Sequence, residues 1–235
     1  MKAVELIIVA PTYNEGDVAK KVIEEWHTEL NKLGISNYKF LLINDGSTDG
    51  TSEIALLAKI PKQNLVIYNK INTGHGLSCI CGYKKALTYN PKWVLQIDSD
   101  DQCDPCYFKE FWDKREKQQV IYGFRKKRDD GWYRLVASRL ISLYIYLFTL
   151  RYCKDPNVPY RLYSNKALKK VINLNYDVNL SNMLLTYRIQ EIYRIQWVSI
   201  HFRDRLQGVS SHKIINSVAL IGQIIIRLLN DKKKK

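Results

Sequence analysis

The sequence predicts an α/β fold built on a mainly parallel sheet, with helices on both faces of the sheet and a helical extension at the C-terminus. The first observation behind this prediction is that short apolar segments alternate with longer segments in which apolar residues recur at helical spacing. The second is that Asp, Asn and Gly gather directly after the apolar segments, where loops are expected. The chain has 235 residues, of which 46% are hydrophobic, so it is long enough to bury the core of one such domain.

The first half of the chain alternates predicted strands with predicted helices. The strands are residues 6–10, 40–43, 65–68 and 93–97, and the helices are residues 18–33, 51–60 and 77–87, followed by a helix after residue 105. The first helix shows the pattern clearly, since Val18, Val22 and Trp26 recur about once per turn. Parallel sheets bind ligands beyond the carboxyl ends of their strands, so the residues that follow each strand are the candidates for function.

The second half of the chain is less regular. Strands are predicted at residues 120–124 and 197–202, and helices at 133–150, after 180 and near the C-terminus, with a charged loop at 125–132 and an irregular segment with two prolines at 155–163. We expect residues 1–212 to form the sheet domain. Residues 213–235 are expected to form an amphipathic helix with a basic tail.

The charge and the cysteines bound the class of protein. The formal net charge of +14 implies an anionic partner, which can be a nucleic acid, phospholipid head groups or a phosphorylated small molecule. The five cysteines are odd in number and unevenly spaced, which favours reduced thiols in a cytoplasmic protein over a disulfide framework. The short N-terminal apolar run lacks a cleavage site and predicts a buried strand rather than a signal peptide. No stretch reaches the roughly 18 apolar residues that a transmembrane helix needs.

An acidic cluster with the sequence Asp-Ser-Asp-Asp-Gln follows the fourth predicted strand. If strand geometry continues, Asp98 and Asp100 point the same way and repel each other, and a hard cation relieves that repulsion. Mg²⁺ or Mn²⁺ suits this position because it commonly binds one or two carboxylates together with substrate phosphates, and Gln102 can add an oxygen ligand. In the alternative interpretation Asp101 or Asp104 only caps the next helix, which accounts for one of these acids.

Polar clusters also follow the first two predicted strands. The first contains Pro11, Tyr13 and Glu15, and the second contains Asp45. Asp45 can accept hydrogen bonds from a base or a ribose, although Asp-Gly alone is also an ordinary turn signal. The sequence Gly-His-Gly at residues 74–76 resembles a phosphate loop only weakly, because it lacks the third glycine of the dinucleotide pattern and the lysine of a P-loop.

Taken in order, these segments resemble family 2 glycosyltransferases of the GT-A fold, a Rossmann-like α/β architecture. Within that family the likeness is greatest to the polyprenyl-phosphate and dolichyl-phosphate sugar transferases. The segments that carry the resemblance run from residue 11 to residue 213 and read PTYNE, NDGSTDGT, NTGHGLSCICGYKKAL, QIDSDDQCDP, GFR, RLYSNKAL and FRDRLQGVSSHK. The resemblance implies an inverting, metal-dependent hexosyltransferase that uses a GDP- or UDP-sugar donor, with Mg²⁺ or Mn²⁺ as its cofactor.

The resemblance also implies a role for each site residue. The residues that would hold the nucleotide-sugar donor are Pro11, Tyr13, Glu15, Asp45 and Asp98. The family's DxDxQ metal site is matched by Asp98, Asp100 and Gln102. Arg125 and Arg134 would face the acceptor phosphate or the donor diphosphate, and Arg205 begins an RxxGxS segment that closes over the donor phosphates. These three arginines, together with Asp98 and Asp100, make up the predicted catalytic group.

Two acceptor chemistries follow from the resemblance. A polyprenyl phosphate is already an anion and needs no general base, so catalysis rests on positioning and charge neutralisation. A sugar hydroxyl of a growing polysaccharide needs a base, for which Asp101 or Asp177 is available. The chain departs from the family pattern at residues 177–182 and at Ser211, which stands where the family has Lys, so both acceptors stay open.

Basic and apolar segments of the second half favour a membrane-associated enzyme. Arg and Lys gather at residues 125–139 beside a Tyr-rich apolar helix, and the last predicted helix is followed by four lysines. We therefore expect a peripheral protein at the cytoplasmic face of a membrane, although core packing, a second copy of the chain or a membrane-anchor subunit accounts for the same helices. A nucleic-acid-binding protein also fits the charge and the aromatic residues, but it does not explain acidic clusters after the strands, so no nucleic-acid partner is expected. A nucleotidyltransferase is the nearer alternative, because it shares nucleotide and metal chemistry.

Overall fold

Seven strands form one mixed sheet in the order β3-β2-β1-β4-β6-β5-β7. The computed structural model describes residues 3–125, 132–172 and 181–203. The strands are β1 (Leu6–Thr12), β2 (Tyr38–Asn44), β3 (Leu65–Asn69), β4 (Trp93–Gln96), β5 (Val120–Arg125), β6 (Arg161–Ser164) and β7 (Gln196–Ile200). Every neighbouring pair is parallel except the two pairs that β6 makes with β4 and β5. The predicted α/β fold with a mainly parallel sheet is confirmed.

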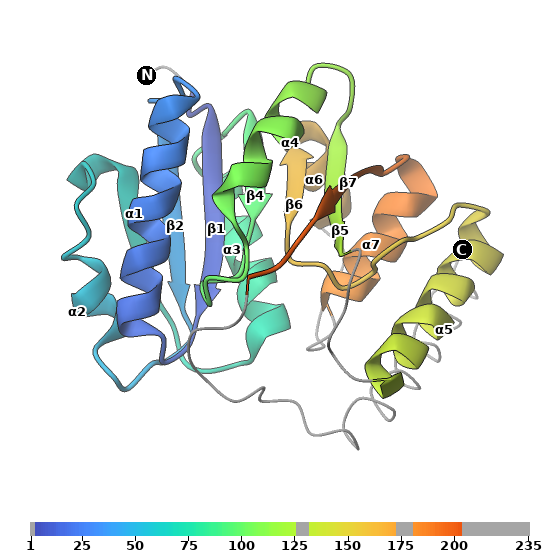
Figure 1. Ribbon diagram of the computed structural model, residues 1–235, viewed down its shortest axis with the longest axis horizontal. Helices are drawn as coiled ribbons and strands as arrows, with labels where there is room; N and C mark the ends of the chain where they lie inside the picture. Colours follow the sequence, from blue (N-terminus) through green and yellow to red (C-terminus); the bar gives the residue numbers. More distant parts are fainter. Residues whose placement is uncertain (1–2, 126–131, 173–180, 204–235) are drawn as a thin grey trace.

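Helices cover both faces of this sheet. They are α1 (Gly16–Lys32), α2 (Thr51–Ala55), α3 (His75–Leu87), α4 (Phe108–Lys114), α5 (Trp132–Thr149), α6 (Asn165–Ile172) and α7 (Ser181–Ile192), with short 3₁₀ helices η1 (Lys62–Asn64) and η2 (Pro105–Tyr107). Figure 1 shows α1 and α4 in front of the sheet and α3 and α6 behind it. Because both faces are covered, all seven residues of β1 are buried, as expected for a central parallel strand.

Two contacts explain how closely the helices lie against the sheet. The indole of Trp26, from α1, is fully buried and meets the rings of Phe108 and Tyr160, with ring centroids 5.4 Å and 5.8 Å away. On the other face, Gly82 lets α3 approach β1, because a Cβ at this position would lie 2.3 Å from Val9 Cγ1. The sheet therefore lies between two closely packed helical layers, and the ends of its strands position the loops.

The carboxyl ends of three parallel strands open on the same edge of the sheet. β1 lies between β2 and β4 and runs parallel to both, so the segments that follow residues 12, 44 and 96 emerge side by side, at the lower edge in Figure 1. These are the segments that carry the polar clusters of the sequence. The prediction that the polar clusters follow strands which end at one edge of the sheet is therefore confirmed.

Three elements differ from the predictions. The predicted helix 51–60 ends at Ala55; Leu56 and Leu57 face solvent, whereas Ala58 and Ile60 pack against the core from outside the helix. The segment 155–163, predicted as irregular, contains the start of β6, whose first residue is the fully buried Arg161. Helix α6 was not predicted, although Ser164 Oγ accepts from the amide of Ala167 at 3.1 Å, which is an ordinary helix-cap contact.

Two predictions about the periphery can be placed only in part. Among the helices of the described residues, none combines the length and the apolar character needed to cross a bilayer. The predicted C-terminal helix, the basic tail and the domain boundary at residue 212 lie outside the described residues. Helix α5 matches the predicted helix 133–150 closely, and its position at one side of the molecule is visible in Figure 1.

Candidate active site

Three loops, after β1, β2 and β4, form the candidate site, and hydrogen bonds join them. Ser99, which stands between the two predicted metal ligands in the sequence, is buried, and its hydroxyl lies 2.7 Å from the carbonyl oxygen of Pro11 and 2.5 Å from Glu15 Oε2. The amide of Asn14 donates to Ser47 Oγ at 3.0 Å. These contacts tie the first polar cluster to the other two, so the three clusters form one site.

Asp98 and Asp100 follow β4 directly. Asp100 is buried, and its Oδ1 accepts a hydrogen bond from the amide of Gln102 at 3.2 Å. Asp98 Oδ1 is buried without a hydrogen-bond donor among the described residues, and it lies 3.5 Å from His75 Nε2. Burial raises the pKa of Asp98, His75 acts in the opposite direction, and the nearby carboxylate of Glu15 adds to the rise. A carboxyl group whose pKa burial has raised in this way is a candidate for binding a cation.

The two carboxylates fit a divalent cation that shares its ligands with a substrate. Within the described part of the chain, no group of three or more His, Cys, Asp or Glu side chains is arranged to hold a metal ion by itself. Mg²⁺ and Mn²⁺ commonly bind through one or two carboxylates and complete their shell with phosphates and water. Asp98, with an oxygen that lacks a donor, and Asp100 suit that arrangement. The site therefore fits a cation that arrives with a nucleotide diphosphate.

Gln102 and Asp101 are engaged by a neighbouring segment. Gln102, the third predicted metal ligand, donates from Nε2 to the carbonyl oxygen of Arg203 at 3.4 Å. Asp101 has a φ of 67°, and its carboxylate accepts from Lys21 Nζ at 2.7 Å and from Arg203 Nη1 at 3.0 Å. Metal ligation by Gln102 stays a prediction, and Asp101 holds the loop in place.

Asp104 supplies the helix cap that the alternative interpretation of the acidic cluster required. Its side chain accepts from the amide of Cys106 at 2.9 Å, at the start of η2. Burial alone would raise the pKa of Asp104, but the hydrogen bonds from Arg203 and the Cys106 amide outweigh it and lower that pKa. Capping thus accounts for one acid of the cluster and leaves Asp98 and Asp100 for another role.

Asp45 is buried at the end of β2, and its carboxylate holds the loop that follows β3. The amides of Thr73 and Gly74 donate to it, each at 2.9 Å, and Lys70 Nζ forms an ion pair with it. Burial tends to raise the pKa of Asp45, but the hydrogen bonds from Lys70 and Thr73 prevail and lower it. A base or ribose that contacts Asp45 must bind beside these groups, so the predicted donor contact stays a prediction.

The predicted donor residues after β1 differ in exposure. Pro11 is buried, and its carbonyl oxygen meets Ser99. The side chain of Glu15 contacts Ser99 and, at 3.5 Å, the hydroxyl of Thr12. Tyr13 is 50% exposed, so its ring is free to lie against a flat ligand such as a nucleotide base. Donor binding by these three residues stays a prediction.

The structure describes the side chain of only one of the three predicted catalytic arginines. Arg125, at the end of β5, donates to both carboxylate oxygens of Asp155, at 2.8 Å and 3.1 Å, and lies over the ring of Phe202. Arg134 belongs to α5, but its side chain is not described, and Arg205 lies outside the described residues. The phosphate contacts expected of all three arginines stay predictions.

Sequence reasoning missed three residues of this site. Ser99 was passed over as the residue between two acids, although alternation along an extended segment predicts that it faces away from them and into the protein. His75 and Lys70 lie on either side of the Gly74 turn after β3, where the rule for parallel sheets places functional residues. The signal for these two was their position after a strand, not their residue type.

The fold and the acids beyond β4 define the class. A mostly parallel sheet with one antiparallel strand, with helices on both faces, is a GT-A-like α/β fold. The chain belongs to glycosyl transferase family 2, whose family model matches residues 7–176. It is therefore a glycosyltransferase that uses a nucleotide-sugar donor, which decides against the nucleic-acid-binding and nucleotidyltransferase alternatives. The matched range spans β1 to α6 and includes both acids of the candidate metal site.

Solved structures show the same fold at low sequence identity. Glucosyl-3-phosphoglycerate synthase from Mycobacterium tuberculosis, in complex with phosphoglyceric acid, matches with a TM-score of 0.70 and 18% identity over 96% of this chain and 79% of that chain. The same synthase with Mn²⁺, UDP-glucose and glycerol 3-phosphate gives a TM-score of 0.69 at 16% identity, with the same coverage. A mycobacterial protein matches with a TM-score of 0.67 and 18% identity over 96% of this chain and 73% of that chain.

Proposed function

We propose that the chain transfers a sugar from a GDP- or UDP-sugar to the phosphate of a polyprenyl-type lipid at a membrane surface, with inversion at the anomeric carbon. The observation that carries this proposal is the pair of acids beyond β4: Asp100 is buried, and Asp98 is partly buried, with one buried oxygen that has no hydrogen-bond donor among the described residues. Asp98 and Asp100 would hold Mg²⁺ or Mn²⁺, which would supply charge neutralisation for a departing nucleotide diphosphate.

The reaction asks the protein mainly for alignment. An oxygen of the acceptor phosphate attacks the anomeric carbon, while the bond from that carbon to the donor diphosphate breaks and the diphosphate leaves with the electron pair. An ionised phosphate has no proton to lose, so no general base is needed. Tyr13 offers an exposed ring to the donor base, and the Asp45 contacts hold the loop before α3 against β2. Fixed geometry of this kind is the main catalytic resource for such a displacement.

The state of Asp101 favours a phosphate acceptor over a sugar hydroxyl. A hydroxyl acceptor needs a general base within hydrogen-bond reach. Asp101, one of two candidates for that base, is 4% exposed and its two carboxylate oxygens accept from Lys21 and Arg203. Both oxygens are therefore engaged by cationic side chains, which places this carboxylate in a structural contact and not against an acceptor hydroxyl. The second candidate, Asp177, lies outside the described residues.

Helix α5 supports a lipid acceptor. Its outer face carries Leu140, Leu143 and Leu147, which are 55%, 53% and 63% exposed, while Ile141 and Ile145 on its inner face are buried. A helix that is apolar on its outward face as well as its inward face suits the boundary of a bilayer, particularly beside the basic residues at 125–139. The apolar face would bring the end of β5 close to a lipid phosphate.

A small phosphorylated acceptor is the second candidate. The solved synthase complexes that share this fold contain phosphoglyceric acid or glycerol 3-phosphate beside the donor site's UDP-glucose and Mn²⁺. Such an acceptor carries hydroxyl groups as well as a phosphate, and attack by a hydroxyl needs a general base. A small acceptor also leaves the exposed apolar face of α5 without a role, which is why we place it second.

The test is a donor and acceptor panel with the full chain and Mn²⁺. GDP- and UDP-sugars are incubated with polyprenyl phosphate in detergent micelles, with 3-phosphoglycerate or with an oligosaccharide, and the released nucleotide diphosphate and glycosylated product are measured. We expect the polyprenyl phosphate to stimulate release most. Stimulation by 3-phosphoglycerate alone would establish the second candidate instead, and stimulation by the oligosaccharide alone would establish a hydroxyl acceptor.

Asp100→Asn tests the metal assignment within the same panel. The variant should lose turnover to background while keeping its melting temperature, because it removes a charge that faces the cation and little packing. Asp113→Asn is the matched control, since Asp113 is 60% exposed on α4 and pairs with Lys109 on the same helix, and it should retain full turnover. Turnover that persists in Asp100→Asn would contradict the role given to the acidic pair.

A further inference from the structure

Arg203 joins three separate parts of the fold. Its Nη1 donates to Glu25 Oε2 on α1 at 2.6 Å and to Asp101 Oδ1 at 3.0 Å, and its Nε donates to Asp104 Oδ2 at 3.0 Å. Its main chain pairs with Gln102 in both directions, through Arg203 N to Gln102 O at 3.2 Å and Gln102 Nε2 to Arg203 O at 3.4 Å. One residue therefore contacts residues 101, 102 and 104 of the acidic loop.

The acidic loop needs such a restraint because its backbone is strained beside the candidate metal ligands. Asp101 has a φ of 67°, in the left-handed region that residues other than glycine seldom adopt, and it follows Asp100 directly. Strain of this kind is unfavourable and persists only where surrounding contacts impose it. The Asp101 side chain is held on one oxygen by Arg203 and on the other by Lys21, so these contacts fix the turn.

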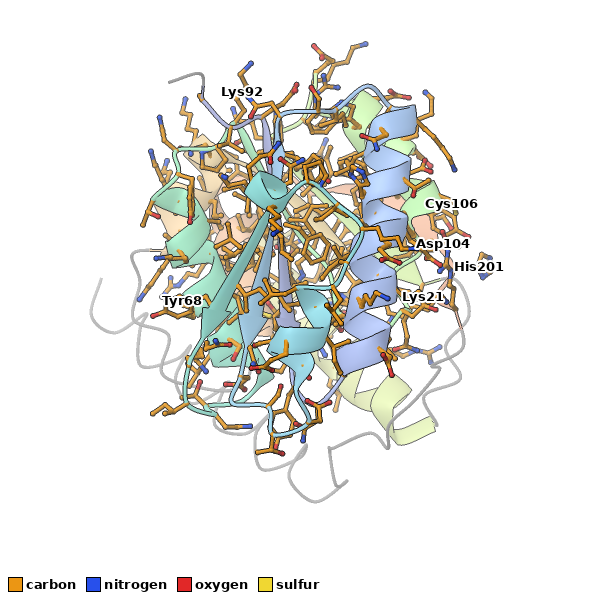
Figure 2. All side chains as sticks on the ribbon, turned by 90° about the vertical axis from the view of Figure 1, so that its left-hand side faces the viewer. Lys21, Tyr68, Lys92, Asp104, Cys106 and His201 are labelled. Carbon is orange, nitrogen blue, oxygen red and sulfur yellow. The ribbon has the colours of Figure 1, made fainter. Side chains whose placement is uncertain are left out.

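Figure 2 shows the setting of this cluster. Lys21, on α1, and Asp104 lie on the same side of the molecule, with His201 of the segment after β7 beside them. The cluster is partly exposed: the side chain of Arg203 is 33% exposed and that of Asp101 is 3% exposed. The carboxylates that Arg203 contacts are not the predicted metal ligands Asp98 and Asp100, so the cluster lies next to the candidate metal site and leaves those two acids available.

We propose that Arg203 is a positioning residue for the metal site: its guanidinium clamps the loop 100–104 to α1 and so holds the Asp100 carboxylate where a divalent cation and a nucleotide diphosphate can share it. This inference rests on the proposed function and deepens it. Arginine suits the task because its planar fork donates to several carboxylates in fixed directions, whereas the single ammonium of lysine cannot reproduce that geometry.

Arg203→Lys separates geometry from charge. Removing the charge altogether would leave Lys21 as the cation shared by Glu25 and Asp101 and would take Arg203 from Asp104, and the excess negative charge would itself attract a cation. The lysine variant keeps the charge and loses the fork. We expect the Mn²⁺ concentration for half-maximal turnover to rise by about tenfold, the scale seen when partners that orient metal ligands are changed, with a smaller change in kcat at saturating Mn²⁺.

Two readouts do not depend on turnover. Mn²⁺ binding in the presence of UDP, followed by the electron paramagnetic resonance signal of free Mn²⁺, should weaken by the same factor in Arg203→Lys. Amide hydrogen exchange of residues 101–104 in the metal-free protein should become faster. Arg115→Lys is the matched control, because Arg115 is also a partly exposed arginine, donates to the carbonyl oxygen of Trp112 on its own helix and lies outside the site; it should change neither readout.

The outcomes distinguish this inference from the proposed function. If the wild type turns over donor and loses turnover in Asp100→Asn, but Arg203→Lys binds Mn²⁺ as the wild type does, Arg203 has no positioning role and only the inference fails. A lower melting temperature without a change in Mn²⁺ binding or in exchange at 101–104 also overturns it, since that result describes a purely structural ion pair. If the wild type shows no donor turnover, the proposed function fails, and the exchange readout still decides whether Arg203 restrains the loop.

Discussion

Single residues at the carboxyl edge of the sheet show two different ways of keeping a buried acid. Asp45 accepts from two backbone amides and an ammonium, so its charge is satisfied by the protein alone. Asp98 has a buried oxygen with no hydrogen-bond donor among the described residues, and burial raises its pKa. Buried polar groups are normally paired, so an unpaired one marks a position that a ligand completes. Asp98, whose buried oxygen lowers the stability of the metal-free protein, is thus the acid expected to bind the cation.

Asp98→Asn should therefore stabilise the metal-free protein while it removes function. The folded-state pKa of Asp98 is raised, so ionisation of this carboxyl group costs stability in the folded chain, and a neutral amide avoids that cost. We expect a gain of about 1 kcal/mol, equivalent to a rise of about 2–4 °C in melting temperature for a chain of this size. Differential scanning calorimetry at pH 7 without metal measures this rise.

The response of the same variant to ligand should be the reverse. Mn²⁺ with UDP should raise the melting temperature of the wild type, because a ligand that binds only the folded state stabilises it, and should leave Asp98→Asn unchanged. Asp113→Asn, which alters an exposed acid on α4, should match the wild type in both measurements. A variant that is less stable without metal and still responds to Mn²⁺ with UDP would show that Asp98 serves the fold and not the cation.

At the scale of helices and strands, apolar periodicity predicted most of the fold, and its failures have physical causes. The six predicted strands correspond to β1–β5 and β7, each a mainly apolar run. Strand β6 was not predicted, because it is four residues long and begins at the charged residue Arg161. The Arg161 guanidinium is buried and donates to the carbonyl oxygens of Pro156, Val158 and Asn182. A buried charge that main-chain carbonyl oxygens satisfy leaves no mark in the apolar periodicity from which the strands were predicted.

Close contact between α3 and the sheet is an element-scale feature that a glycine makes possible. A Cβ on Gly82 would lie 2.3 Å from Val9 Cγ1 and 3.0 Å from Ile43 Cγ1, so Gly82→Val must push α3 away from β1 and β2. We expect a loss of about 3 kcal/mol in the free energy of unfolding, measured by urea denaturation. Lys84→Val is the control, because it places the same β-branched residue at an exposed position of the same helix. Equal losses in the two variants would mean that helix propensity, not packing, sets the effect.

Over the whole molecule, the site is assembled by contacts between residues far apart in the chain. Ser99 meets Pro11, Asp45 meets Lys70, and Arg203 meets Glu25, pairs separated by 88, 25 and 178 positions. The sequence predicted which clusters would share an edge, because strand order and direction decide that. The sequence could not predict which acids of the loop pair with Arg203 and which are left for a metal ion. Asp101 and Asp104 accept from Arg203 because of the path of the loop, which residue type does not reveal.

These long-range pairs make stability depend on acid in a direction that can be worked out. The pKa of Asp45 and the pKa of Asp104 are both lowered in the folded protein, because donors from Lys70, Arg203 and backbone amides outweigh the effect of burial. An acid whose folded-state pKa lies below its unfolded value of about 3.9 stabilises the fold above that pH and loses this contribution as the pH falls through the folded-state pKa. The contribution of Asp45 and Asp104 to the unfolding free energy should thus be nearly constant from pH 7 to pH 5 and decline below about pH 4.

Asp45→Asn tests this account at both ends of the range. At pH 7 the variant loses the ion pair to Lys70 and should be less stable by about 1–3 kcal/mol. Below pH 4 its free energy of unfolding should decline less steeply than that of the wild type, since one of the acids responsible is gone, while Asp104 and Asp49, whose pKa is also lowered, preserve part of the slope. Urea denaturation at a series of pH values measures both effects, with Glu53→Gln on the surface of α2 as the control. Parallel pH profiles for Asp45→Asn and the wild type would mean that Asp45 is no better stabilised in the folded chain than in the unfolded one, and that the loop after β3 is held by its backbone alone.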